Sequence, residues 1–282
     1  KGRTLLTSDG TTILGADDKA GIAEILTMIE RIQTENRPHG TICVAFTPDE
    51  EIGMGAEHFN LDQFGAEYAY TLDGDSEGEI QYENFNACKA EFEIRGFNVH
   101  PGEGKDTMIN ASLVAIEINN CLPSMETPRG TEDYEGFYHL ISMQGEVGEA
   151  KLNYIVRDHD KNGFEERKKT LRLIEKNLNA KWGEGTVTLK ITDQYLNMKE
   201  IVEEHMHLID HAKKACEAAG VAPLILPIRG GTDGCQLSFK GLPCPNLGTG
   251  GHAFHGPYEH ISVEGMEKSV ELLLALIQEY TK

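Results

Sequence analysis

The spacing of apolar residues changes from strand-like to helical in the first part of the chain. Two short apolar stretches, 4–7 and 11–14, flank an Asp-Gly pair, which is a strong signal for a hairpin turn. The apolar residues that follow have a helical period, so we predict a helix that begins near Asp17 or Asp18 and ends before Pro38. The chain therefore opens with a predicted strand pair and then a helix.

Two continuous apolar runs come next and are typical of buried strands. TICVAFT (41–47) and YAYTLD (68–73) have the composition of strands that are covered on both faces. After Lys199 buried strands again alternate with helices. The predicted helices are 201–219 and 262–280, and the predicted strands are 224–228 and 243–248. Strands that alternate with helices predict an α/β sheet covered by helices.

The middle of the chain has a different order of elements. We predict, in sequence, strand 87–96, helix 107–121, strands 137–145 and 149–158, helix 161–180 and strand 186–194. This β-α-β-β-α-β order is ferredoxin-like. The sequence therefore predicts a discontinuous α/β domain, residues 1–84 and 200–282, with an inserted domain, residues 85–199.

Charge and composition narrow the classes of function. The 282 residues include 26 Lys and Arg against 46 Asp and Glu, a formal net charge of −20. This charge argues against nucleic-acid and membrane partners, and no apolar run reaches the roughly 18–20 residues of a membrane-spanning helix. The six cysteines are far apart and the amino end lacks a signal-peptide pattern, so we predict reduced thiols in a cytoplasmic protein.

Several carboxylates follow predicted strands at the point where each strand ends. Asp17 and Asp18 follow one strand, Glu50 and Glu51 follow the next, and Asp73 ends a third. Ligands of open α/β sheets bind at this edge. Taken singly, each acid has an ordinary explanation, either helix capping or an exposed first helical turn. Together they repel one another, which favours a site for a cation.

A histidine for this site comes from the glycine-rich segment GTGGHAFHGPYEH (248–260). His252, His255 and His260 are all candidates, and their spacing does not rank them. Imidazole combined with carboxylates suits catalytic zinc, with cobalt or manganese as alternatives. The sequence has no G-x-S-x-G motif, no P-loop and no GxGxxG, so metal-assisted hydrolysis is the best class of reaction.

These motifs together resemble the M20 family of dinuclear zinc peptidases, and within it the tripeptide aminopeptidases. The segments that carry the resemblance are GADDKAG (15–21), FTPDEE (46–51), TLDG (71–74), NVHPG (98–102), RGGTDG (229–234) and FHGPYE (254–259). The resemblance runs in order through the chain. It implies an α/β catalytic domain with an inserted ferredoxin-like lid domain, two zinc ions, and release of the amino-terminal residue of tripeptides in the cytoplasm.

The resemblance also implies a role for individual residues of the metal site. Asp17 matches the carboxylate that bridges both zinc ions, and Asp73 matches a ligand of the first zinc. Glu51 and His255 match ligands of the second zinc. Glu50 matches the general base, which takes a proton from the attacking water and passes it to the leaving amine.

Four further residues match substrate-binding positions. His100 resembles the lid histidine that stabilises the tetrahedral oxyanion, and Asn110 is a weaker lid candidate. Arg157 and Arg229 are candidates to pair with the carboxyl terminus of the substrate, with an ordinary surface ion pair as the alternative. A homodimer formed through the lid is a further expectation.

One departure from the family concerns its H-x-D motif, which supplies a first-zinc histidine and is absent from residues 1–282. We therefore expect that a separate amino-terminal segment is a partner of this chain and that the chain alone is inactive. The alternatives are a non-catalytic peptide-binding relative and another M20 hydrolase, a carboxypeptidase or an aminoacylase. The presence of both Glu50 and Glu51 argues against the first of these.

Overall fold

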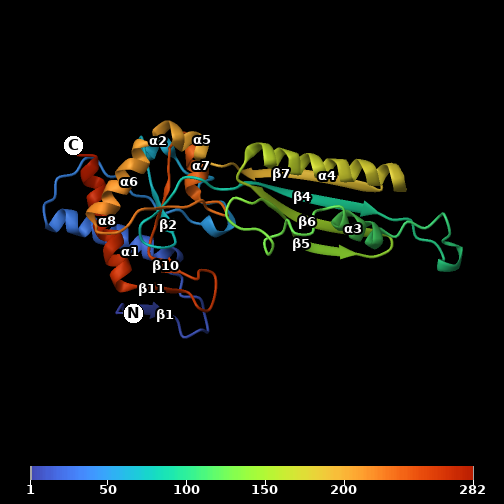
Figure 1. The fold of residues 1–282 in the computed structure, drawn as a ribbon, viewed down its shortest axis with the longest axis horizontal. Helices are drawn as coiled ribbons and strands as arrows, with labels where there is room; N and C mark the ends of the chain where they lie inside the picture. Colours follow the sequence, from blue (N-terminus) through green and yellow to red (C-terminus); the bar gives the residue numbers. More distant parts are fainter. Residues whose placement is uncertain (1, 282) are drawn as a thin grey trace. The chain divides into compact units, whose positions relative to one another are not determined.

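The computed structural model describes residues 2–281, which divide into two compact units. The discontinuous unit contains the residues up to Asn84 and those from Met198 onward, and the continuous unit is Phe85–Asn197. Figure 1 shows the continuous unit in green to yellow. No helix in the described part of the chain is long and apolar enough to cross a bilayer.

The discontinuous unit contains two sheets. One sheet has the order β2-β9-β3-β8, in which β2 is parallel to β9, β9 is antiparallel to β3 and β3 is parallel to β8. The other is antiparallel, with the order β1-β11-β10. The strands are β1 (Leu5–Thr7), β2 (Thr71–Gly74), β3 (Glu79–Gln81), β8 (Leu224–Ile225), β9 (Asn246–Gly248), β10 (Gly251–His252) and β11 (His260–Ser262).

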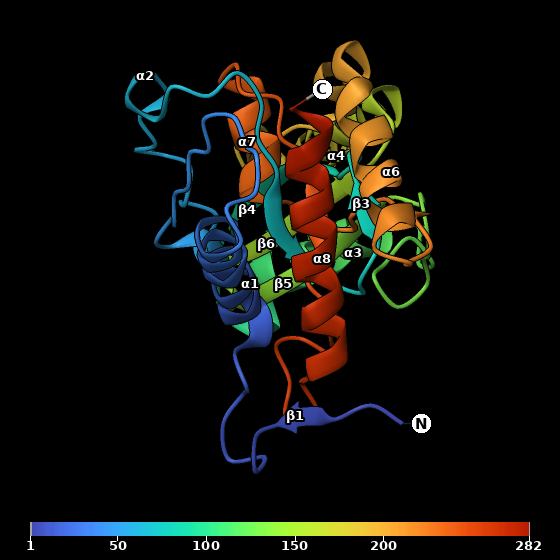
Figure 2. The ribbon, with the colours of Figure 1, turned by 90° about the vertical axis from the view of Figure 1, so that its left-hand side faces the viewer.

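Helices pack beside these strands, and α8 lies between α1 and α6 (Figure 2). Ser262 caps α8 by accepting a hydrogen bond from the Gly265 amide at 3.0 Å, and the buried leucines of α8 face the unit's interior. The helices are α1 (Ala16–Thr34), α2 (Leu61–Phe64), α5 (Lys199–Val202), α6 (His207–Ala218), α7 (Asp233–Phe239) and α8 (Val263–Glu279), with the short 3-10 helices η1 (Glu50–Ile52) and η3 (Glu203–His205).

The continuous unit has the predicted β-α-β-β-α-β order. Its antiparallel sheet is ordered β5-β6-β4-β7, and its core is formed by apolar side chains from the sheet and both helices, such as Phe92, Tyr154 and Leu171. Asn110 and Asp160 cap the two helices. The elements are β4 (Asn86–Arg95), α3 (Ala111–Asn120), β5 (Phe137–Gly145), β6 (Glu149–Asp158), α4 (Lys161–Trp182) and β7 (Val187–Tyr195), with the 3-10 helix η2 (Pro101–Glu103).

Two strand predictions in the discontinuous unit are wrong. The predicted hairpin of 4–7 with 11–14 does not form, because β1 pairs with β11 instead, with Leu6 opposite Ile261. Residues 41–47 are not a buried strand: they have no strand neighbour in the described structure, and Phe46 is 51% exposed. An apolar run becomes a strand only where another strand accepts its hydrogen bonds.

Two helix predictions have the wrong limits. Helix 107–121 begins later than predicted, at Ala111, because the side chain of Asn110 caps it. The predicted helix 201–219 is interrupted by the 3-10 helix η3. Helix α5 covers its first residues, and α6 covers most of the rest. The prediction of a helix starting near Asp17 or Asp18 is confirmed, although both residues have non-helical dihedral angles within α1.

Helix α1 buries one acidic side chain, Glu24, which is 1% exposed and whose carboxylate oxygens have no hydrogen-bond partner among the described residues. Burial, with a smaller contribution from the charge of Asp18, raises the pKa of Glu24 from 4.5 to about 9. The folded state therefore favours the neutral acid. Its contribution to stability is complete below pH 4.5 and is lost as the pH rises toward 9.

We therefore expect the stability of Glu24→Gln and that of the wild type to diverge as the pH rises. Between pH 5 and 9 the wild type should lose stability relative to the variant by up to about 1.4 kcal/mol per pH unit. Urea unfolding at three pH values measures this difference. Glu30→Gln, at an exposed position of the same helix, is the control. Stability curves of Glu24→Gln and wild type that stay parallel would contradict the prediction.

Candidate active site

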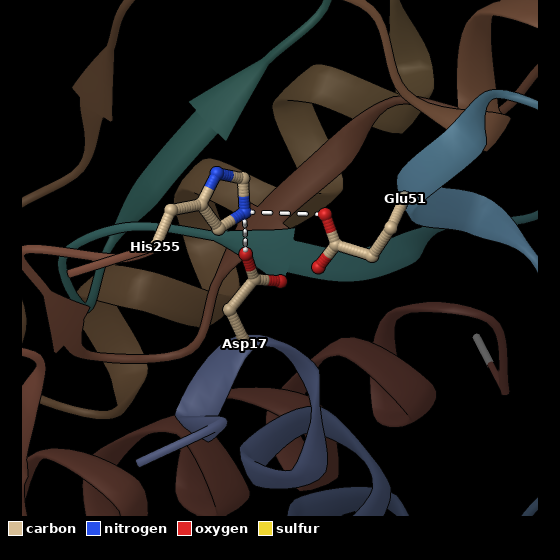
Figure 3. A group of neighbouring side chains, drawn as sticks. All are labelled: Asp17, Glu51 and His255. Carbon is tan, nitrogen blue, oxygen red and sulfur yellow. Dashed lines mark hydrogen bonds and ion pairs between the residues drawn. The ribbon is translucent and has the colours of Figure 1, made fainter. Parts of the chain in front are cut away.

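Three side chains that are distant in sequence meet in the discontinuous unit. His255 Nε2 lies 2.9 Å from Asp17 Oδ2 and 3.2 Å from Glu51 Oε2 (Figure 3). One ligand atom from each residue lies within 4.8 Å of the others, and this is the group in the described residues that could hold a metal ion. We call Asp17, Glu51 and His255 the three-ligand cluster.

The three ligands come from three different segments. Asp17 lies at the start of α1, Glu51 lies in η1, and His255 lies in the loop between β10 and β11. Ala253 and His255 have positive φ angles of 55° and 61°, a conformation that non-glycine residues rarely adopt. This loop conformation directs the imidazole of His255 toward Asp17 and Glu51 (Figure 3).

Glu259 fixes the start of α1 against the loop between β10 and β11, which carries His255. Its carboxylate accepts hydrogen bonds from the Gly15 amide at 2.7 Å and the Asp17 amide at 3.1 Å. Burial alone would raise the pKa of Glu259, but these backbone donors outweigh it and lower the pKa. Glu259 is 2% exposed and lies in the FHGPYE motif, which was the one sequence signal for it.

Glycine brings α1 close to β2 and so brings two further acids to the site. A Cβ atom on Gly21 would collide with the Leu72 carbonyl oxygen, so that only glycine allows this approach. Asp18 lies on this side of α1, and Asp73 follows Leu72 in β2. The edge predicted from strand ends thus gathers carboxylates from α1, η1 and β2.

The acids at this edge repel one another. Burial, together with the charges of Asp18, Glu50 and Asp17, raises the pKa of Asp73 to about 9. Burial also raises the pKa of Asp18 to about 8, with a contribution from Asp17. A bound cation removes such repulsion, and imidazole and carboxylate groups are both ligands of zinc in proteins. The residues present therefore fit a metal ion.

Glu50 lies beside the three-ligand cluster and is not one of its members. Burial, together with the charges of Asp233, Glu51 and Asp17, raises its pKa to about 7. A carboxylate with this pKa exchanges a proton readily near neutral pH, which is what a general base requires. The structure therefore separates Glu50 from its neighbour Glu51 by both position and environment.

The same acids also raise the pKa of His255. Burial lowers its pKa, but the charges of Glu51 and Asp17 outweigh burial and the net change is upward. The other candidates lie elsewhere: the rings of His252 and His260 pack together with centroids 5.4 Å apart. Sequence spacing could not choose among the three because the direction of each ring depends on the loop's backbone angles.

Three of the predicted substrate-binding residues belong to the continuous unit. His100 is exposed and its Nδ1 accepts a hydrogen bond from the Gly102 amide at 3.2 Å. Asn110 caps α3 by accepting one from the Leu113 amide at 3.3 Å. Arg157 is 8% exposed.

Arg157 is held by its own unit. Its Nη1 donates to the backbone carbonyl of Val156 at 3.0 Å, and its guanidinium lies 5.3 Å from the ring centroid of Tyr195. Arg229, the fourth predicted substrate-binding residue, is half-buried in the discontinuous unit, in the turn between β8 and α7.

Comparison with known proteins identifies the family. The model of peptidase family M20/M25/M40 matches residues 12–279. Peptidase T of Halothermothrix orenii is 55% identical over 280 residues, which cover 99% of this chain and 69% of that protein. Peptidase T of Clostridium perfringens (strain ATCC 13124) is 56% identical over 283 residues, which cover 100% of this chain and 70% of that protein.

A solved structure with the same fold agrees with these sequence matches. The aminopeptidase PepT from Bacillus cereus ATCC 10987 superposes with a TM-score of 0.86 and 28% sequence identity, over 99% of this chain and 74% of that chain. The predicted M20-type α/β fold and the resemblance read from the sequence motifs are therefore confirmed. The chain belongs to peptidase family M20/M25/M40 and is a hydrolase of peptide bonds.

Proposed function

We propose that the chain carries the metal site and the general base of a tripeptide aminopeptidase. The observation that supports this most is the meeting of Asp17, Glu51 and His255 with Glu50 beside them. The relatives named peptidase T support the choice of substrate. The free cysteine thiols suit the reducing cytoplasm, where we place the activity.

Metal binding and proton transfer are assigned to different residues of the chain. Asp17, Glu51 and His255, together with Asp73, would supply ligands to the two zinc ions of a complete active site, with cobalt or manganese as alternatives. Zinc at such a site supplies a Lewis acid and lowers the pKa of water. A carboxylate oxygen of Glu50 takes the proton of the water that attacks the scissile carbonyl, and then delivers it to the leaving amine.

We propose that four residues bind the substrate and that the protein forms a homodimer. His100 would donate to the developing oxyanion, with Asn110 as a weaker lid candidate. Arg157 and Arg229 would pair with the free carboxyl terminus, because a guanidinium binds a carboxylate with two hydrogen bonds. The continuous unit would act as the lid and as the surface of a homodimer.

Analysis of the products tests the proposed activity. The experiment uses a chimera in which residues 1–282 replace the matching segment of the Clostridium perfringens relative. We expect it to release the amino-terminal residue of a tripeptide with three different residues. Release of the carboxyl-terminal residue would indicate a carboxypeptidase. Binding of the tripeptide without hydrolysis would indicate a peptide-binding relative.

Recognition of the substrate's carboxyl terminus gives a second expected result. In the chimera, a tripeptide with an amidated carboxyl terminus should have a KM at least about tenfold higher than the free acid, because each arginine loses a charged hydrogen bond of about 1.5–3 kcal/mol. Replacing Arg157 and Arg229 with Ala should abolish the difference between the two substrates. If the double variant still prefers the acid, these arginines are not in the site.

A further inference from the structure

Helix α7 contacts the segment that carries both glutamates of the site. We call residues 47–57 the glutamate turn; it includes η1. At its beginning, Thr47 Oγ1 donates a hydrogen bond to Asp233 Oδ2 at 2.7 Å. A Cβ atom on Gly55 would collide with the same Asp233 carboxylate, so the turn approaches this side chain more closely than any other residue would allow.

Two more side chains from α7 and its end contact the far part of the glutamate turn. Gln236 Nε2 donates to the Gly53 carbonyl at 3.0 Å. Lys240 Nζ donates to the Glu57 carbonyl at 2.8 Å and also to the carbonyl of Ala56. The glutamate turn is therefore bonded to α7 at its beginning, middle and end.

The part of the glutamate turn that carries Glu50 and Glu51, residues 47–54, contains no buried residue. η1 has no buried residue, and Asp49 before it has a positive φ of 63°. Inside the turn, the Gly53 amide bonds to the Glu50 carbonyl at 2.6 Å and the Met54 amide bonds to the Asp49 carbonyl at 3.0 Å. Contacts from outside therefore decide where Glu50 and Glu51 lie.

The buried carboxylate of Asp233 lowers the stability of the fold, which a merely structural contact would not explain. It is 4% exposed, and its Oδ1 has no hydrogen-bond partner among residues 2–281. A buried carboxylate with an unpaired oxygen costs stability, and an apolar or hydroxyl side chain would pack there at lower cost. A buried polar group of this kind points to a role beyond stability.

We infer that Asp233 is a positioning residue that acts through Thr47 on the glutamate turn, so that Glu51 reaches Asp17 and His255. The inference deepens the proposed function and rests on it, because it assigns a purpose to the position of Glu51. Asp233 itself need not touch the substrate or the metal.

Zinc binding to the 282-residue chain tests the inference. Thr47→Val removes the hydroxyl donor from a half-buried position and keeps the shape of the side chain. We expect it to weaken zinc binding about three- to tenfold, because about one hydrogen bond is lost. Thr47→Ser should restore the wild-type affinity. Thr41→Val, the same substitution at an exposed position before the turn, is the matched control.

A double-mutant cycle links the effect to Asp233. Asp233→Ala should weaken zinc binding as Thr47→Val does, and the double variant should be no weaker than Asp233→Ala alone. Additive effects would overturn the inference, because they would mean that the two residues act separately. A Thr47→Val chain that binds zinc like Thr41→Val would overturn it as well.

Hydrogen exchange of the metal-free chain separates this inference from the proposed function. In Thr47→Val, the amides of 49–55 should exchange faster than in the wild type, while those of β4 to β6 stay unchanged. Faster exchange in a chain that binds no zinc would support the positioning role and contradict the metal site. Unchanged exchange in 49–55 would overturn the positioning role, whatever the chain binds.

Discussion

Glu50→Gln should lower kcat by about 10²–10⁴-fold in the chimera that carries residues 1–282 in the Clostridium perfringens relative. Glutamine has nearly the same shape but does not accept the proton of the attacking water. The pKa of Glu50, raised by burial to about 7, suits this transfer near neutral pH. KM should change little, because Glu50 is not assigned to substrate binding.

Glu57→Gln is the matched control, since Glu57 is an exposed acid of the same turn. It should keep kcat within about twofold of the wild type, as surface substitutions usually do. Steady-state kinetics with one tripeptide gives kcat and KM for the wild-type chimera, Glu50→Gln and Glu57→Gln. A Glu50→Gln enzyme that retains more than about a tenth of the wild-type kcat would remove Glu50 from the role of general base.

Residues 1–282 alone should bind fewer than two zinc ions per chain and should not hydrolyse tripeptides. Among the described residues, His255 is the one imidazole in the group that could hold a metal. Asp17 and Asp73 would serve a second ion with carboxylates only, and catalytic zinc normally has three protein ligands. The second ion should therefore bind weakly.

Zinc titration and a tripeptide assay of the same preparation test this expectation. The chimera should bind two zinc ions and hydrolyse the substrate. His255→Ala in the 282-residue chain should abolish the remaining tight site, whereas His39→Ala, an exposed histidine elsewhere in the unit, should not. Two tight sites and turnover by residues 1–282 alone would contradict the prediction.

The elements that the sequence predicted best are those with a complete local signal. β5 and β6 have the predicted limits 137–145 and 149–158, because both strands pair within one hairpin of the continuous unit. Residues 41–47 have an equally apolar pattern and yet form no strand. Pairing with a distant strand is a tertiary property that the pattern alone does not contain.

The candidate site was predictable in type but not in detail. Strand ends indicated which acids gather at one edge, and Asp17, Glu51 and Asp73 do lie near it. The choice of His255 depends on positive φ angles in its loop, and the part played by Glu259 depends on two backbone amides of the α1 start. Both are backbone features, which side-chain chemistry in the sequence does not reveal.

The central claim is that Glu50 and Glu51, adjacent in sequence, have different tasks. Elemental analysis of the metal content of the chimera tests it most directly, with Glu50→Gln and Glu51→Gln purified side by side. We predict that Glu50→Gln keeps the metal content of the wild type and that Glu51→Gln loses about one ion per chain. Equal loss of metal in both variants would contradict this account.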